Sequence, residues 1–86
     1  MKFMAIFRLT QPVTAEIMGQ IEAEHQRMKE LMDAGALEAE YMSAERTRGW
    51  FVMQGASAEA VRADLATLPL YKYLDFEIVP LGEPVI

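Results

Sequence analysis

The segment from Leu68 to Ile78 restricts the fold of this chain more than any other. Leu68 ends a helical pattern, and Pro69 stops the helix because proline has no backbone N–H and clashes with the preceding turn. From Tyr73 to Pro80, apolar and polar side chains then alternate, which predicts a strand. The chain therefore ends by leaving a helix through a proline turn and returning to a sheet.

The remaining residues supply the other elements of that sheet. Strands are predicted at 2–9, 37–44 and 48–54, before the last strand at 73–80, and helices at 14–34 and 57–68. Thr14 and Ser57 are good helix N-caps, and Gly35 suits the left-handed position that follows a helix. The order βαββαβ predicts one α+β domain over residues 1–86, with a ferredoxin-like four-stranded antiparallel sheet, helices on one face, and a tail at 81–86.

The first strand is apolar on both of its faces. Phe3 and Phe7 point to one side, whereas Met4 and Ile6 point to the other. Two helices on one face leave the second face uncovered, and 52% of the residues are hydrophobic, more than a monomer of this size can easily bury. We therefore expect a homo-oligomer, a dimer or larger, in which two sheets pair as a dimeric α+β barrel.

Composition argues against several classes of protein. The absence of cysteine rules out disulfides, thiolate metal sites and a cysteine nucleophile, and a single histidine argues against a histidine-rich zinc site. A net charge of -5 argues against nucleic acid as a partner. Arg8 interrupts the first apolar run, and no run approaches the ~20 apolar residues of a membrane span. We expect a cytoplasmic protein without a membrane partner.

The first predicted helix contains the strongest candidates for chemistry. At about 100° per residue, Glu24 and His25 project within its apolar stripe. A carboxylate that points toward a core is costly, and burial raises its pKa, while histidine as a residue type titrates near neutral pH. The pair is typical of acid/base catalysis that moves a proton between carbons. In the alternative interpretation, both side chains reach solvent, or Glu24 pairs with Arg8 or Arg48. The stripe comprises Ile17, Met18, Ile21, Met28, Leu31 and Met32.

Side chains on the predicted strands are candidates for binding a small-molecule substrate. Tyr41 and Tyr73 carry polar tips on large apolar rings, and Trp50 either lines the same pocket or packs in a core or interface. Arg8 and Arg48 are the candidate cations. The sequence has no glycine-rich phosphate loop, nucleophile elbow or cluster of metal ligands, so we expect neither a cofactor nor a metal.

The Leu-Pro-Leu run at 68–70 and the Tyr-Leu-Asp-Phe-Glu run at 73–77 resemble the closing segment of the muconolactone delta-isomerase family. The resemblance continues back without a gap to about Ala23. The resemblance implies a small cofactor-free enzyme that assembles into large symmetric oligomers. Such an enzyme shifts a double bond in an unsaturated lactone during aromatic-compound breakdown. It also implies a pocket between the first helix and the sheet, closed by a neighbouring chain. Glu24 falls on a glutamate of the family, and His25 stands where the family has lysine.

The second predicted strand departs from that family. Members read Gly-x-Trp-Arg-x-x-Trp-Arg, whereas residues 35–42 read Gly-Ala-Leu-Glu-Ala-Glu-Tyr-Met. Both arginines, which would be natural partners of a substrate carboxylate, are absent. Arg8, Arg46 and Arg48 are the candidates to replace them. The resemblance therefore implies a relative with an altered pocket.

Three functions follow, in order of preference. The first is an isomerase, or related proton-transfer enzyme, acting on a small cyclic metabolite, with Glu24 as the base and His25 as an acid or relay. Tyr41 and Tyr73 would orient the ligand. The second is a non-catalytic small-molecule-binding or assembly module on the same barrel, which needs a pocket but no poised base. The third is a cofactor-independent oxygenase.

Overall fold

The fold was obtained as a computed structural model that describes residues 1–85. Ile86, the last residue of the predicted tail, lies outside the described residues. The elements, in chain order, are β1 (Lys2–Leu9), α1 (Ala15–Gly19), α2 (Ile21–Asp33), β2 (Leu37–Met42), β3 (Arg48–Gln54), α3 (Ala58–Leu65), a short 3-10 helix η1 (Tyr71–Tyr73) and β4 (Leu74–Leu81).

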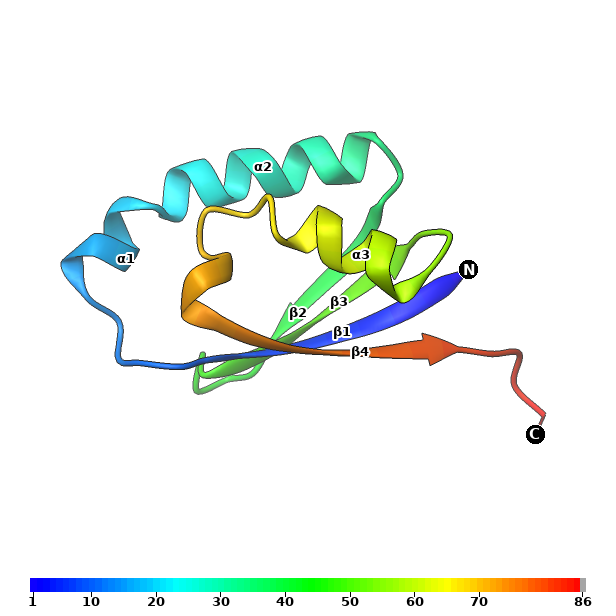
Figure 1. Cartoon of the computed structure of the whole chain (residues 1–86). Helices are drawn as coiled ribbons and strands as arrows, with labels where there is room; N and C mark the ends of the chain where they lie inside the picture. Colours follow the sequence, from blue (N-terminus) through cyan, green and yellow to red (C-terminus); the bar gives the residue numbers. More distant parts are fainter. Residues whose placement is uncertain (86) are drawn as a thin grey trace.

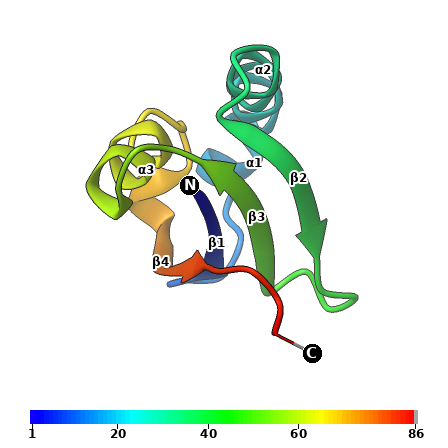
Figure 2. The same cartoon turned by 90° about the vertical axis from the view of Figure 1, so that its right-hand side faces the viewer.

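The four strands form one antiparallel sheet in the order β2-β3-β1-β4. The helices lie on one side of this sheet, with α2 above β2 and β3 and α3 on the side of β1 and β4 (Figures 1 and 2). The predicted α+β fold with ferredoxin-like topology is confirmed. None of the helices within residues 1–85 has the length and apolar character needed to cross a membrane.

The main core lies between the helices and the inner face of the sheet. Phe3, Ala5 and Phe7 of β1 are buried there, and the rings of Phe7 and Phe51 stand 5.0 Å apart between centroids. Gly49 of β3 lies opposite Phe7, and a Cβ on it would overlap that ring and come within 2.6 Å of the Tyr41 carbonyl oxygen. This close approach requires glycine. The helices contribute Met28, Leu31, Val61 and Leu65 to the same core.

The predicted helix over 14–34 is broken into two. The Thr14 side chain caps α1 by accepting a hydrogen bond from the Ile17 N–H at 3.2 Å, but α1 ends at Gly19. Gln20 separates it from α2, at a place where glycine weakens the helix. The part of the apolar stripe that lies in α1 is unevenly buried: Ile17 is buried, whereas Met18 is 61% exposed. Met32 is also exposed, although the stripe placed both methionines on the inner face.

Some element ends differ from the predicted ones, whereas the capping positions at Gly35 and Ser57 agree with the prediction. β2 ends at Met42 rather than Ala44, and α3 ends at Leu65 because tighter turns take over before Pro69. Gly35 has a positive φ of 81°, as its position after a helix predicted. Ser57 caps α3 through the Ala60 N–H at 3.1 Å, also as predicted.

A β-bulge in β2 determines which of its side chains face the helices. The register with β3 shifts between Leu37 and Ala39, so an extra residue is accommodated there. Beyond the bulge, Glu40 and Met42 pair with Phe51 and Gly49, whose inner face packs toward the helices. Tyr41 consequently points to the opposite face.

That opposite face carries no helix among the described residues (Figure 2). Along its centre lie half-buried apolar side chains, including Met4, Ile6 and Val52. We call this surface the open face. Its remaining side chains include Arg8, Tyr41, Arg48, Trp50, Asp75, Glu77 and Val79.

Candidate functional site

A cleft of about 650 Å³ separates α1 and α2 from the sheet and from the turn between β2 and β3. Most of its wall is apolar, because the inner face of the sheet and the inner sides of both helices meet there. The apolar residues are Phe7, Leu9, Val13, Ile17, Met18, Ile21, Met28, Met42, Ala44, Phe51, Leu70 and Leu74. Such a cleft suits a small, largely apolar ligand.

Glu24 projects into this cleft from α2, and only 6% of its surface is exposed to solvent. Its Oε1 accepts a hydrogen bond of 2.9 Å from the backbone N–H of Leu70, just before η1. Burial raises the pKa of this carboxyl group, the Leu70 hydrogen bond opposes that rise, and the nearby charge of Glu40 adds to it. The partner of Glu24 is therefore a backbone amide rather than Arg8 or Arg48.

His25 and Glu40 line the same cleft from two different elements, α2 and β2. Both residues are exposed overall, so they lie where the cleft opens to solvent. Desolvation nevertheless raises the pKa of the Glu40 carboxyl group, and the neighbouring His25 opposes this rise. The sequence prediction missed Glu40, because strict alternation from the buried Leu37 would have turned it away from the helices.

Arg8, Arg46 and Arg48 were the candidates to replace the two missing strand arginines. Of these three, Arg46 lines the cleft. It lies in the turn between β2 and β3, where its φ of 61° is unusual for a residue other than glycine. The Ser43 Oγ supports this turn by accepting hydrogen bonds from the N–H groups of Thr47 and Arg48, each at 3.3 Å. The turn thus places a guanidinium-bearing residue at the edge of the cleft.

Arg8 and Arg48 lie elsewhere. They line a second cleft of about 520 Å³, whose wall also includes Asp75 and Glu77 of the open face. The Arg48 guanidinium stands 5.3 Å from the ring centroid of Trp50, a cation–π contact on that same face. Neither arginine lines the cleft of Glu24.

The predicted aromatic ligand-binding residues also lie outside the Glu24 cleft. Tyr41 is 61% exposed and, with Trp50, belongs to the open face. Tyr73 is buried beside Ile17, and its hydroxyl donates a hydrogen bond of 2.5 Å to Glu16 of α1. This hydrogen bond raises the pKa of the Tyr73 hydroxyl. The roles of Tyr41, Tyr73, Trp50, Arg8 and Arg48 in substrate binding remain predictions.

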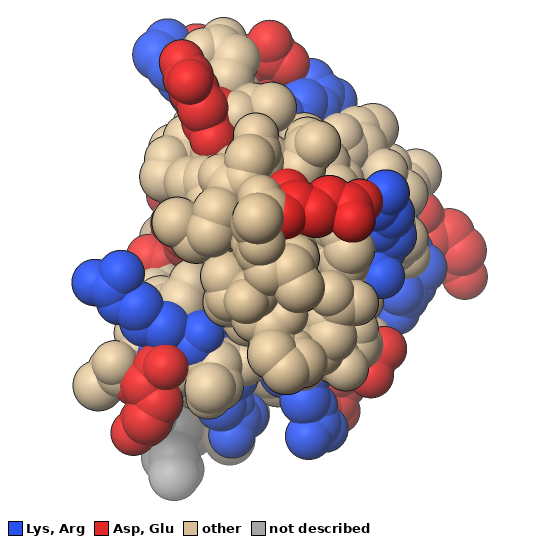
Figure 3. Space-filling model, turned by 90° about the vertical axis from the view of Figure 1, so that its left-hand side faces the viewer, with Lys and Arg blue, Asp and Glu red and all other residues tan. Residues whose placement is uncertain are grey.

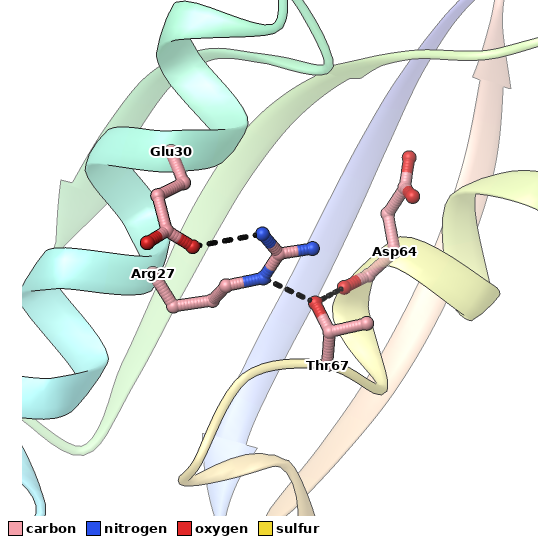
Figure 4. Close-up of polar contacts among 4 residues, drawn as sticks. All are labelled: Arg27, Glu30, Asp64 and Thr67. Carbon is pink, nitrogen blue, oxygen red and sulfur yellow. Dashed lines mark hydrogen bonds and ion pairs between the residues drawn. The ribbon is translucent and has the colours of Figure 1, made fainter.

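A polar network joins α2 to the segment that carries Leu70 (Figure 4). Arg27 donates from Nε to the Thr67 Oγ1 at 2.8 Å and from Nη1 to Glu30 at 2.9 Å. The Thr67 hydroxyl in turn donates to the Asp64 carbonyl at 2.6 Å. This network holds the segment between α3 and η1 against the helix that bears Glu24.

The end of the molecule at α1 is poor in charged groups. Figure 3 views this end, and charged side chains gather mainly around its periphery. Val13, Met18 and Met42 are exposed apolar residues that also line the cleft. The opening of the cleft is therefore partly apolar. Among residues 1–85, no group of three or more His, Asp or Glu side chains is arranged to hold a metal ion.

The family model for muconolactone delta-isomerase matches residues 1–84. The chain belongs to the muconolactone delta-isomerase family. The fold is similar to a crystal structure of muconolactone isomerase at 3.3 Å resolution, with a TM-score of 0.82, 24% sequence identity, and coverage of 99% of this chain and 92% of that one. No curated protein sequence gives a significant match.

Membership of the muconolactone delta-isomerase family confirms the resemblance carried by residues 68–70 and 73–77. The similarity to the crystal structure confirms the fold, and at 24% identity it concerns the fold alone. The resemblance also implied a pocket between the first helix and the sheet. The Glu24 cleft lies between α1, α2 and the sheet.

Proposed function

We propose that this protein is an isomerase that moves a proton, and with it a double bond, within a small unsaturated lactone-like metabolite of aromatic-compound breakdown. The observation that carries the proposal is the Glu24 carboxyl group, which is buried in an apolar cleft and has a raised pKa. A carboxyl group of this kind is suited to general acid–base catalysis, because a pKa closer to the working pH favours both taking and returning a proton. Family membership supports the reaction class.

In the proposed reaction, the Glu24 carboxylate takes a proton from the ring carbon next to the lactone carbonyl. The resulting electron pair moves into the ring as a dienolate, and a proton then returns to the more distant carbon. His25, at the opening of the same cleft, can relay that proton. The positively charged Arg46 can stabilise the negative charge that develops on the lactone oxygen.

We further propose that the working form is a homo-oligomer in which a second copy covers the open face. Met4, Ile6 and Val52 there are apolar and only half-buried in one chain, as expected for a surface that a partner completes. The exposed Val13 and Met18 at the cleft opening give a neighbouring chain an apolar surface to close.

The proposal is tested by replacing Glu24 and following isomerisation of an unsaturated lactone. With α-angelica lactone as substrate, Glu24→Gln should lower kcat/KM by roughly a hundredfold or more, the usual scale for removing a general base. Glu22→Gln is the matched control, since Glu22 lies exposed on the same helix and does not line the cleft. Circular dichroism and thermal denaturation would show that both variants keep the fold.

Equal activity in Glu24→Gln and Glu22→Gln would remove Glu24 from the mechanism. If the wild-type protein binds lactones without isomerising any of them, the cleft serves a non-catalytic binding module instead. The two outcomes are separated by measuring binding and turnover on the same samples.

A further inference from the structure

The charged groups of the cleft are unusual for a site that binds an acid. Glu24 and Glu40 supply two carboxyl groups to its wall, and Arg46 is the one Lys or Arg among the described residues that line it. His25 is the remaining titratable residue of that wall. An anionic ligand would therefore meet two carboxyl groups and a single guanidinium, within walls that are mostly apolar.

The two carboxyl groups come from opposite sides of the cleft. Glu24 projects from α2, whereas Glu40 projects from β2 on the face of the sheet that is turned toward the helices. The β-bulge between Leu37 and Ala39 gives Glu40 this orientation. The two groups are close enough for the charge of Glu40 to act on Glu24, and His25 acts on both. A ring-shaped ligand in the cleft would lie between the helix and the strand that bear them.

We propose that Glu40 is a second proton-transfer residue opposite Glu24, and that this pair of carboxyl groups makes the cleft selective for uncharged unsaturated lactones over lactones that bear a carboxylate. The proposal rests on the proposed function, because it names the substrate class and a further catalytic residue of the same site. It assigns a role to a residue that the sequence pattern did not single out.

The proton balance of the reaction requires one ionised and one protonated carboxyl group. Two nearby carboxyl groups disfavour double ionisation, so over a range of pH the pair holds a single proton, and the reactive state is the one in which this proton lies on Glu40 and Glu24 is ionised. In the forward step, Glu24 removes a proton from the ring carbon next to the carbonyl, and that C–H bond breaks. The double bond shifts, Glu40 donates its proton to the distant carbon, and a new C–H bond forms there. Glu24 ends protonated and Glu40 ionised, and a proton returned through His25 or solvent restores the starting state.

The preference for an uncharged ligand follows from desolvation. A ligand carboxylate that enters the cleft loses water, and the apolar part of the wall offers it no hydrogen bonds in return, since the hydroxyl-bearing residues Ser43 and Thr47 come only from the β2–β3 turn side. It would also stand near the ionised member of the Glu24–Glu40 pair, and like charges brought together at a binding site oppose binding. Arg46 is a single positive charge in an exposed turn at the edge of the cleft, and one exposed guanidinium compensates only part of these costs. An uncharged lactone avoids all of these costs.

The test compares two probes that differ in charge. The first is α-angelica lactone, and the second is its analogue with a carboxymethyl group in place of the methyl group. Binding to the wild-type protein, Glu40→Gln and Glu38→Gln is measured by NMR titration at neutral pH, and turnover is followed on the same samples. Glu38→Gln is the matched control, because Glu38 lies on the same strand, is exposed and does not line the cleft.

We expect the wild-type protein to bind the uncharged lactone about tenfold or more tightly than the anionic analogue, a difference of about 1.4 kcal/mol. Glu40→Gln should reduce this ratio several-fold and slow turnover of the uncharged lactone by roughly tenfold or more. Glu38→Gln should change neither quantity. The proposal is overturned if the anionic analogue binds as well as the uncharged lactone, if neither probe binds, or if Glu40→Gln leaves turnover and selectivity unchanged.

These outcomes are distinct from failure of the proposed function. Selective binding of the uncharged lactone without any double-bond shift would support the charge selection and refute the isomerase. Efficient turnover of the anionic analogue would support the isomerase and refute the selection proposed for Glu24 and Glu40.

Discussion

The backbone N–H of Leu70 donates a hydrogen bond of 2.9 Å to the Oε1 of Glu24, across 46 positions of sequence. This contact joins the helix that carries the candidate base to the turn that follows α3. It fixes the direction of the carboxyl group in the cleft and partly offsets the effect of burial on its pKa. The position of this carboxyl group thus depends on one backbone amide, which also opposes the larger effect of burial on its pKa.

The pH dependence of stability should report the raised pKa of Glu24. The folded protein holds this proton more tightly than the unfolded chain, in which glutamate titrates at about pH 4.3. The wild type should therefore lose stability relative to Glu24→Gln as pH rises from that value through the pKa of the folded state. The glutamine still accepts the Leu70 hydrogen bond, so the ionisable group is the main difference. Urea denaturation at a series of pH values measures the effect.

Glu22→Gln serves as the reference for that titration, because Glu22 is exposed on the same helix. Its stability should follow the wild type at every pH. A Glu24→Gln difference that stays constant with pH, or one in which the wild type gains stability as pH rises, would contradict burial of an ionisable Glu24.

Arg27 should act on the reaction as a positioning residue. Its hydrogen bond to Thr67 holds the segment before Leu70, so Arg27→Gln should weaken the Leu70–Glu24 contact and raise the pKa of Glu24 further. The pH at which kcat/KM begins to rise should move upward, with a stability loss of about 1 kcal/mol or less because the network is exposed. A pH–rate profile measures the shift.

Lys29→Gln is the comparison for Arg27, since it breaks the exposed Lys29–Asp33 pair on the same helix. That variant should keep the wild-type pH profile. An unchanged profile in Arg27→Gln, or an equal shift in both variants, would assign the Thr67 contact a purely structural role.

Assembly should depend on the open face. Trp50→Glu places a charge in the proposed interface beside Ile6, its partner in the β1–β3 register. Burial of that charge between two sheets would be costly, so the variant should sediment as a smaller species than the wild type. Ala63→Lys, on the exposed side of α3, should leave assembly unchanged. A wild-type monomer, or a Trp50→Glu variant of unaltered size, would refute the interface.

The approach of Phe7 to Gly49 predicts a stability effect independent of function. Gly49→Ala should destabilise the protein by about 1–3 kcal/mol, because the new methyl group meets both the Phe7 ring and the Tyr41 carbonyl. Gly82→Ala should have little effect, since no atom lies within 4 Å of its Cβ position. Equal midpoints in chemical denaturation would contradict the packing described for β3.

Helical periodicity was sufficient to predict that Glu24 points inward, because α2 is regular through that turn. It failed at Met18, which lies in the separate short helix α1 and is 61% exposed. Strand alternation placed Tyr73 at the start of the last strand, but Tyr73 lies in η1 and its hydroxyl turns to Glu16 instead of the cleft. Both outcomes depend on how the segments pack, which local sequence does not specify.

Strand alternation likewise predicted the two-sided first strand but missed Glu40. The bulge between Leu37 and Ala39 exchanges the inner and outer positions of β2, and it arises from pairing with β3 rather than from local propensity. Arg46 reaches the cleft through a turn with an unusual φ, which residue order alone did not reveal.

The most direct test of the account is solvent exchange during turnover. Wild-type protein and α-angelica lactone are incubated in deuterated buffer, and the product is examined by NMR. The account predicts deuterium at the newly protonated ring carbon at a rate that Glu24→Gln abolishes and Glu22→Gln preserves, because a carboxyl group in the cleft exchanges its proton with solvent between turnovers. Incorporation that proceeds equally in Glu24→Gln, or at the uncatalysed rate in all three proteins, would contradict proton transfer by Glu24.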